Sequence, residues 1–259
     1  MSKTVVAIGD LHCGSVAGLT PPGWQVSKDR FPNISALQHE AWREYQKIAR
    51  EWVEPDLLIV NGDAIDGHGK RSGGTELLTS DMDEQCDMAI KVIRSFKPKQ
   101  VIMTYGTPYH VAGESGVDFE RIIARQVDAE IHSHAFIKVD GVMFDCKHKV
   151  GSSAVPHGRY TAVAKEKLWN MLWAEQDENQ PNSDIILRSH VHYYGFCGTD
   201  KALMMTLPAL QCAHTKFGAR QCSGVVNWGA VRFEINKGEY TWEAKTKRLQ
   251  GEKARIVEL

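Results

Sequence analysis

The chain has 259 residues, of which 31 are Lys or Arg, 32 are Asp or Glu and 42% are hydrophobic. This composition excludes a collagen, a coiled coil and wholesale disorder, and the chain is long enough for one large domain or two small ones with an apolar core. No stretch is typical of a linker, and we expect a single domain over residues 1–259. The formal net charge of −1 gives no global electrostatic case for nucleic-acid binding, although a local basic groove stays open.

No part of the sequence predicts a membrane partner or a secretory route. No apolar run approaches the ~20 residues that a membrane span needs, and the N-terminus lacks the anatomy of a signal peptide. The cysteines are scattered without a Cys-x-x-Cys pair, which indicates free thiols in a reducing compartment. We therefore expect a cytoplasmic protein, and the sequence predicts no particular oligomeric state. The cysteines are Cys13, Cys86, Cys146, Cys197, Cys212 and Cys222.

The first half alternates short apolar runs with amphipathic segments. Thr4–Ile8, Leu57–Val60 and Val101–Tyr105 are β-branched-rich runs typical of parallel strands buried on both faces. Between them, helical spacing of apolar residues predicts helices over Ile34–Trp52 and Met82–Phe96, the second capped at Ser80. This alternation predicts right-handed βαβ crossovers and an α/β core.

The second half is richer in hairpins. Asp140-Gly141 predicts a tight turn between two strands, and Lys237-Gly238 predicts another within Val225–Lys245. A helix is expected over Ala162–Trp173, and Ile185–Leu187 is a further buried strand. Together the halves predict two packed sheets with helices outside. The large apolar residues of the helical segments are interpreted as packing: Trp42, Trp52, Met82, Trp169, Met171 and Trp173.

Each predicted strand is followed at once by glycine or by side chains that bind metals. The carboxyl ends of strands in open α/β sheets form ligand crevices, so these segments are expected to converge. A lone Gly-Asp is usually a turn and a lone histidine usually structural, but five such signals at five strand ends favour one site. The segments are Gly9–Gly14, Asn61–Gly67, Gly106–His110, the region of His148, and Ser189–His192.

The ligand types indicate the kind of ion. His190 and His192, two residues apart, place both imidazoles on one face of an extended segment. Asp and His without cysteine favour Mn, Fe, Ni or Zn in a reactive centre over a structural zinc cluster.

The blocks GDLHCG, NGDAIDG, GTPYH, a solitary histidine after a strand, and SHVH resemble, in this order, the signature blocks of the calcineurin-like metallophosphoesterase superfamily. The resemblance implies two packed mixed β-sheets flanked by helices, an α/β/β/α sandwich in which the C-terminal hairpin finishes the second sheet. It also implies two divalent metal ions and a hydroxide generated on them that attacks phosphorus. The third block is similar to variants encoded by phages and prophages, which would place the protein in the host cytoplasm.

Carried over by motif, the resemblance assigns the first ion to Asp10, His12 and His192, and a bridging role to Asp63. His148 and His190 would hold the second ion. A bridging carboxylate lets two ions sit roughly 3.5–4 Å apart and clamp phosphate oxygens. Asp66 is interpreted as the acceptor that orients a ligating histidine.

The third block departs from the family pattern, in which an asparagine follows the glycine and completes the second metal site. Here Thr107 offers a weaker hydroxyl ligand, or water fills the gap. His110, displaced by two residues, is the candidate catalytic histidine that protonates the leaving oxygen or steadies the phosphoryl charge.

The preferred substrate class is a phosphodiester, either a nucleotide or a nucleic acid, because His-x-Gly in the first block resembles the phosphodiesterase and nuclease branches more than the protein phosphatases. A small phosphomonoester, or a non-catalytic binding scaffold on a decayed fold, is the alternative. Arg159 and Tyr160 could line a nuclease groove, whereas Lys245–Arg248 is interpreted as solvated edge. Side chains that could meet the substrate, each with a bland surface or loop alternative, are His68, Lys70, Arg71 and His157.

Overall fold

The first half of the chain and the C-terminal hairpin build a six-stranded sheet. The computed structural model describes residues 2–111, 116–153, 155–176, 180–212, 225–249 and 258. The strand order is β11-β10-β1-β2-β3-β4, in which β1 to β4 are parallel and the hairpin is antiparallel. Val5 pairs with Leu57, and Leu58 pairs with Val101. The strands are β1 (Lys3–Ile8), β2 (Leu57–Asn61), β3 (Val101–Thr104), β4 (Ala129–His132), β10 (Trp228–Asn236) and β11 (Glu239–Lys247).

A second, five-stranded sheet comes from the middle of the chain. Its order is β5-β6-β7-β9-β8, with β6, β7 and β9 parallel and both edge strands antiparallel. Val5, Ile59 and Phe233 of the first sheet pack against Phe144 and Leu187 of the second to form one core. The strands are β5 (Ala135–Val139), β6 (Val142–Cys146), β7 (Ile185–Arg188), β8 (Gly195–Gly198) and β9 (Leu203–Thr206).

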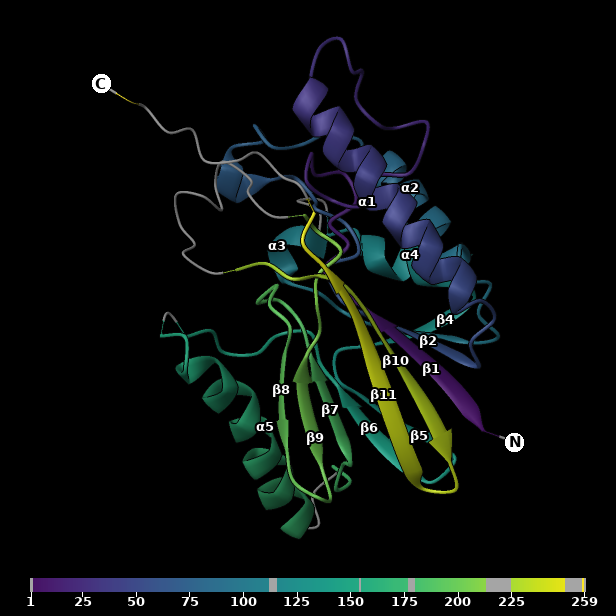
Figure 1. Ribbon diagram of the computed structural model, residues 1–259, viewed down its shortest axis with the longest axis vertical. Helices are drawn as coiled ribbons and strands as arrows, with labels where there is room; N and C mark the ends of the chain where they lie inside the picture. Colours follow the sequence, from purple (N-terminus) through teal and green to yellow (C-terminus); the bar gives the residue numbers. More distant parts are fainter. Residues whose placement is uncertain are drawn as a thin grey trace.

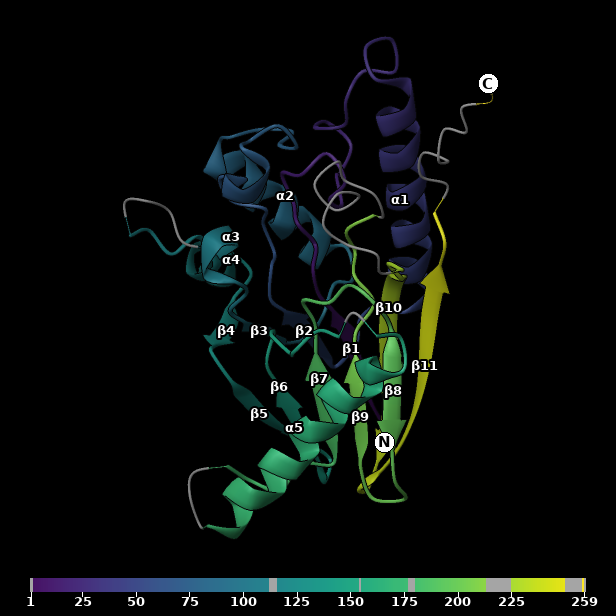
Figure 2. The ribbon, with the colours of Figure 1, turned by 90° about the vertical axis from the view of Figure 1, so that its left-hand side faces the viewer.

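Helices cover the outer faces of both sheets, and the resulting layers can be followed in Figures 1 and 2. Two mixed sheets flanked by helices confirm the predicted fold class. The first sheet carries α1 (Pro32–Glu51), α2 (Met82–Arg94) and α4 (Phe119–Gln126), and the second carries α5 (Gly158–Glu175). Two short helices lie in loops: η1 (Lys70–Ser72) and α3 (Pro108–Val111).

Three sequence-based expectations were wrong. The C-terminal hairpin extends the first sheet, because β10 pairs with β1, and so does not finish the second. Asp81 caps α2 in place of Ser80, since its carboxylate accepts the backbone N–H groups of Asp83 and Glu84. Lys245 and Lys247 are not merely solvated, because both form ion pairs with glutamates of α1.

The apolar residues near the end of α5 also depart from expectation. Trp169, Met171 and Trp173 were interpreted as packing, but each is exposed. The helix begins earlier than predicted, at Gly158, and its buried side chains are Val163, which packs on the second sheet, and Asn170, which bonds to the loop before β7.

Five cysteines are free thiols, as predicted, and Cys222 lies outside the described residues. Among the described residues, no helix combines the length and the apolar character needed to cross a membrane.

Candidate metal centre

The five segments singled out in the sequence meet at the carboxyl ends of the strands. The loop after β1 runs beside the loop after β2, since Asp10 N–H donates to the Gly62 carbonyl at 3.1 Å and His12 N–H to the Asp63 carbonyl at 3.0 Å. The backbone N–H of Ser189 donates to the His148 carbonyl at 2.7 Å, which joins the segments after β6 and β7. Side chains from both sheets therefore face one region.

Asp10, His12 and His192 form the first group of possible metal ligands, with one ligand atom from each lying within 4.8 Å of the others. The Nε2 atoms of His12 and His192 are 3.2 Å apart, and His192 Nε2 lies 3.3 Å from an Asp10 carboxylate oxygen. Asp10 and His12 are fully buried and His192 is partly open to solvent.

Asp63, His148 and His190 form the second group, at the same mutual spacing. His148 Nε2 lies 3.0 Å from Asp63 Oδ2. Thr107 Oγ1 lies 3.0 Å from that carboxylate oxygen, 3.4 Å from His148 Nε2 and 3.3 Å from His190 Nδ1. The threonine hydroxyl thus faces the ligand atoms of the second group.

The two groups adjoin each other. His12 Nε2 lies 3.8 Å from Asp63 Oδ2, and His148 Nε2 lies 3.9 Å from Asp10 Oδ1. Each carboxylate is therefore within reach of a histidine of the other group, as a bridged pair of ions requires.

Hydrogen bonds leave the correct ring nitrogens free for a metal. His148 Nδ1 donates to the Asn61 carbonyl at 2.8 Å, and His12 Nδ1 donates to Asp66 Oδ1 at 2.9 Å. In both rings Nε2 is then the nitrogen that faces the carboxylates and can bind a metal, and such partners orient ligating imidazoles. His110 Nδ1 donates to the Asp66 carbonyl at 2.7 Å, which leaves its Nε2 free as well.

His12, Asp66 and His110 also lie close enough together to be considered as ligands. However, both histidines direct Nδ1 at oxygens of Asp66, so this group is a hydrogen-bonded network beside the centre. The rings of His12 and His110 meet edge to face, with centroids 4.6 Å apart.

The buried negative charge of the cluster requires a cation. Asp10 and Asp63 are 0% and 1% exposed, and among the described residues neither pairs with a lysine or an arginine. Buried carboxylates are stable only when paired with a positive charge or a metal. The donor set therefore fits divalent ions.

The shifted pKa values of the ligand side chains also indicate that the site requires positive charge. Burial opposes ionisation of Asp63, but the neighbouring His148 outweighs it and holds the pKa of this carboxyl far below its ordinary value. Burial likewise disfavours the charged form of His148, yet Asp63 raises its pKa to about 10. Burial, followed by the charge of His148, lowers the pKa of His190 to about 4. Without a metal, a proton on His148 supplies the charge that an ion would bring.

The backbone around the centre is held in rarely used conformations. Left-handed φ values are uncommon outside glycine and cluster at functional sites. Glycines allow close contacts here: a Cβ added to Gly62 would lie 2.5 Å from His148 Nδ1, and one added to Gly106 would collide with Asp63. Candidate ligands with left-handed φ are Asp10 (50°), His12 (45°), Asp63 (50°), His190 (73°) and His192 (55°).

Two buried supports were not predicted. Glu120, at the start of α4, accepts the Ala64 N–H at 3.0 Å and the Gly106 N–H at 2.8 Å, so it ties together the loops that carry Asp63 and Thr107. Asn61 Nδ2 donates to Ser189 Oγ at 2.8 Å and links the two sheets beneath the centre. Asn61 and Ser189 stand beside predicted ligands in the sequence, which is a usable signal, whereas Glu120 gives none.

The predicted substrate contacts are not part of this cluster. Within the described chain, His68 and His157 make no hydrogen bond to the six ligand side chains; His68 is half-buried, and His157 is exposed at the start of α5. Lys70 is exposed in η1, and the side chain of Arg71 lies outside the described residues.

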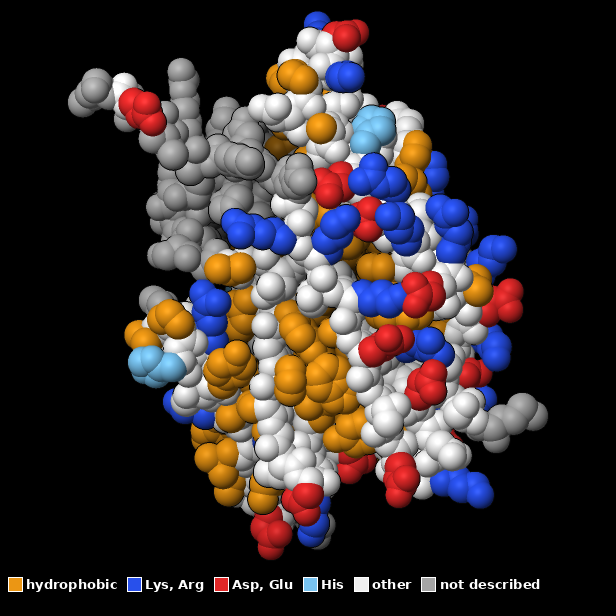
Figure 3. Space-filling model, in the orientation of Figure 1, with side chains coloured by type: hydrophobic (Ala, Val, Ile, Leu, Met, Phe, Trp, Pro, Cys, Tyr) orange, Lys and Arg blue, Asp and Glu red, His pale blue; other side chains and the backbone are white. Residues whose placement is uncertain are grey.

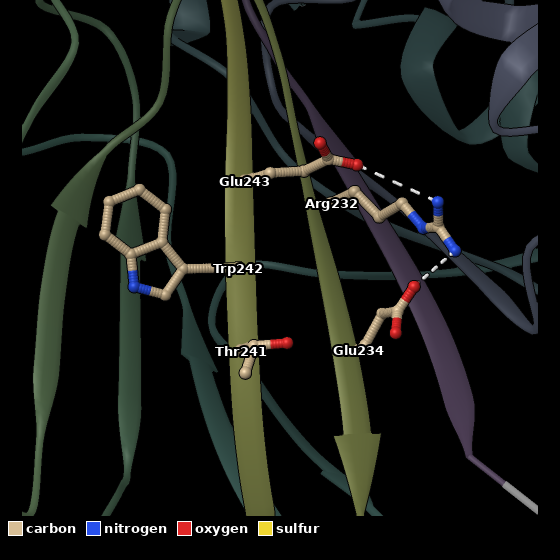
Figure 4. Close-up of a pocket in the computed structure, with 5 residues that line it drawn as sticks. All are labelled: Arg232, Glu234, Thr241, Trp242 and Glu243. Carbon is tan, nitrogen blue, oxygen red and sulfur yellow. Dashed lines mark hydrogen bonds and ion pairs between the residues drawn. The ribbon is translucent and has the colours of Figure 1, made fainter.

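A pocket on the outer face of β10 and β11 is separate from the centre (Figure 4). Arg232 lies between Glu234, at 2.7 Å, and Glu243, at 3.8 Å. Arg232 thus pairs with both carboxylates of the pocket, and the pocket adds no group to the metal ligands.

No protein-family model and no curated protein sequence matches the chain. Solved structures do resemble it in chain path. Vacuolar Protein Sorting 29 from Cryptosporidium parvum is 10% identical, with a TM-score of 0.48 over 95% of this chain and 98% of that one. A predicted phosphoesterase from Streptococcus pneumoniae is 11% identical, with a TM-score of 0.43 over 96% and 93% of the two chains. An archaeal phosphodiesterase is 15% identical, with a TM-score of 0.47 over 93% and 99%.

Proposed function

We propose that this chain is a metal-dependent phosphoesterase of the calcineurin-like type that hydrolyses phosphodiesters. The observation that carries the proposal is the adjoining pair of ligand groups, Asp10–His12–His192 and Asp63–His148–His190, built on two buried carboxylates that pair with no lysine or arginine in the described part of the chain. Two divalent ions held there would neutralise phosphate oxygens and lower the pKa of a water molecule.

The remaining side chains of the centre position and exchange protons. Asp66 holds the ring of His12 through its carboxylate and that of His110 through its carbonyl. His110 Nε2 is the free nitrogen that exchanges a proton with the leaving oxygen. Burial, followed by the charge of His12, lowers the pKa of His110 below the ordinary value for histidine. Thr107 would support the second ion in place of an amide oxygen.

The surroundings of Arg159 support the proposal of a substrate whose phosphate group lies next to the metal centre. Its guanidinium carbon lies 4.7 Å from the centre of the Tyr193 ring, and Tyr193 directly follows His192 in the chain. Arg159 Nε and the Tyr193 hydroxyl are buried without a hydrogen-bond partner in the described part of the chain. A guanidinium held by stacking retains its other N–H groups for an anionic oxygen.

The assignment is tested by hydrolysis of an aryl phosphodiester and an aryl phosphomonoester with Mn²⁺-loaded protein. We expect Asp63→Asn and His190→Ala to abolish turnover while circular dichroism and the melting temperature show a folded chain. His132→Ala, at an exposed histidine on β4, is the matched control and should keep wild-type activity. Full activity in Asp63→Asn would refute the assignment. Turnover of the monoester alone would make the protein a phosphomonoesterase, and turnover of neither ester would leave a binding scaffold.

We expect removal of the Arg159 side chain to weaken substrate binding more than it slows the chemical step. Arg159→Ala should raise the KM for the diester about tenfold or more, with kcat changed less, because a charge-assisted hydrogen bond contributes roughly 1.5–3 kcal/mol. Lys201→Ala, at the turn between β8 and β9, removes an exposed cation as the control. An unchanged KM in Arg159→Ala would exclude the contact.

A further inference from the structure

The outer face of α5 is apolar where a surface helix is normally polar. Trp169 is 59% exposed, Leu168 56% and Met171 54%, and Leu172 and Trp173 are exposed as well. The helix meets the second sheet through a narrow face, with Val163 packed on Ile186 and Met204. Apolar patches of this kind on a surface helix mark sites of association.

The pictures show how far this face stands from the rest of the chain. In Figure 2 the C-terminal half of α5 projects beyond the strands of the second sheet. In Figure 3 hydrophobic side chains gather along the edge of the molecule where α5 runs. Nothing in the described residues packs over these turns.

The charged side chains of α5 that point toward the second sheet already have partners. Glu166 accepts from Arg188 Nε at 2.8 Å, and Lys167 Nζ donates to Asn182 Oδ1 at 2.6 Å. These contacts fix which side of α5 faces the sheet. Lys165 and Glu175 are exposed on the other side and have no ion-pair partner among the described residues.

The exposed side carries a regular stripe. Its members follow one another at intervals of four, three, four and three residues, which is the spacing of the contact seam between two packed helices. At its centre are Leu168 and Leu172, with a charge of opposite sign at either side of this pair. The stripe consists of Thr161, Lys165, Leu168, Leu172 and Glu175.

The stripe is complementary to a copy of itself in the antiparallel direction. With a two-fold axis at the level of Asn170, Leu168 of one copy meets Leu172 of the other. Lys165 of each copy then faces Glu175 of the other, so both ends of the seam form opposite-charge pairs. A two-fold interface uses the same patch on both subunits and requires this kind of self-match. A parallel arrangement would instead set lysine against lysine and glutamate against glutamate.

We propose that the chain forms a homodimer through antiparallel packing of two α5 helices about Leu168 and Leu172. Even when all five large apolar side chains are counted, their exposed parts amount to on the order of 500 Å² per copy, below the ≈800 Å² of a standard interface. The dimer is therefore weak, with a dissociation constant in the micromolar range. A lipid surface fits less well, because the stripe offers one lysine and one glutamate instead of a basic cluster.

The test is sedimentation velocity of the full chain from about 1 to 200 μM. We expect wild type to pass from monomer to dimer over this range, and Leu168→Asp to remain monomeric. Because Leu168 is exposed in the single chain, this variant should keep its melting temperature at low concentration. A wild-type chain that stays monomeric at 200 μM overturns the proposal.

Charge reversal identifies the partner and its direction. Lys165→Glu or Glu175→Lys alone should weaken dimerisation about tenfold, because each places like charges at both ends of the seam. The double variant K165E/E175K should restore the affinity, and so should an equimolar mixture of the two single variants. Lys201→Glu, on an exposed turn, is the control and should dimerise like wild type. If Lys165→Glu behaves like Lys201→Glu, or if the double variant is not rescued, the antiparallel α5 interface is wrong.

Discussion

Backbone strain at the centre shows which residues the fold holds in place for chemistry. Asp10, Asp63 and His192 all adopt left-handed φ values, which cost energy in residues with a Cβ. Their carboxylates and imidazoles meet only because the loops turn in this way. The strained backbone is thus what brings the ligand side chains together. The hydrogen bonds from His12 to Asp66 and from His148 to Asn61 hold these ligands in place.

Most residues of the metal centre could be predicted from the sequence. Asp10, Asp63 and the His190–His192 pair stand directly after apolar strands, and this placement predicted that they would lie together. Thr107 was named as a hydroxyl ligand because it follows the glycine of the third block, and its Oγ1 lies 3.0 Å from Asp63 Oδ2. Glu120 was missed because it comes from a short helix and acts through backbone N–H groups, which leave no pattern in the sequence.

Thr107 gives a prediction about the second ion. Thr107→Val keeps the shape of the side chain but removes the hydroxyl, so we expect the weaker of two Mn²⁺-binding steps in calorimetric titration to lose about tenfold or more in affinity. Thr107→Asn supplies an amide oxygen and should bind at least as tightly as wild type. Equal isotherms for wild type and Thr107→Val would show that the hydroxyl has no part in binding.

At the scale of elements, α4 acts as a clamp on two loops. Glu120→Gln replaces one acceptor oxygen with a donor that faces a backbone N–H, so we expect a loss of about 2 kcal/mol in the free energy of unfolding. Urea denaturation measures this loss. Glu130→Gln, at an exposed position on β4, serves as the matched control. A cost no larger than that of the control would show that the clamp does not stabilise the loops.

The start of β1 is joined to the loop before β2 by Asp56. The carboxylate accepts the Thr4 N–H at 2.9 Å and pairs with Lys99 at 2.9 Å, and these contacts lower its pKa to about 2. A lowered pKa in the folded state contributes stability above the ordinary pKa of aspartate, and this stability is lost as the pH falls towards about 2.

Asp56→Asn should therefore cost about 1–2 kcal/mol in the free energy of unfolding at pH 7, and roughly half of that at pH 3. Urea denaturation at both pH values measures the difference. Asp29→Asn, at an exposed position, should cost nothing measurable at either. A cost for Asp56→Asn that is independent of pH would contradict the assigned ionisation.

The individual helices and strands were easier to predict from the sequence than the strands and helix faces that they pack against. The hairpin turn at Lys237-Gly238 was predicted, but sheet membership was not, because an alternating pattern does not state which edge a hairpin joins. The tryptophans of α5 were misjudged for a related reason. Helical periodicity identifies apolar positions, but the face that is covered depends on Arg188 and its contacts with Glu166, which come from tertiary structure.

At the scale of the whole molecule, the two sheets bring together carboxylates that repel one another. Mn²⁺ added to chelator-treated protein should raise the melting temperature by about 5–10 °C at 100 times the dissociation constant, since this corresponds to about 2.7 kcal/mol. Differential scanning calorimetry measures the shift. Asp63→Asn should show a much smaller shift, and an equal shift in both proteins would locate metal binding elsewhere.

The most direct test of the centre is anomalous diffraction from crystals grown with Mn²⁺. We predict two peaks per chain, one bound by Asp10, His12 and His192 and the other by Asp63, His148 and His190. A single peak would reduce the centre to a mononuclear site. The absence of any peak between these side chains, or peaks bound only by other residues, would contradict the account.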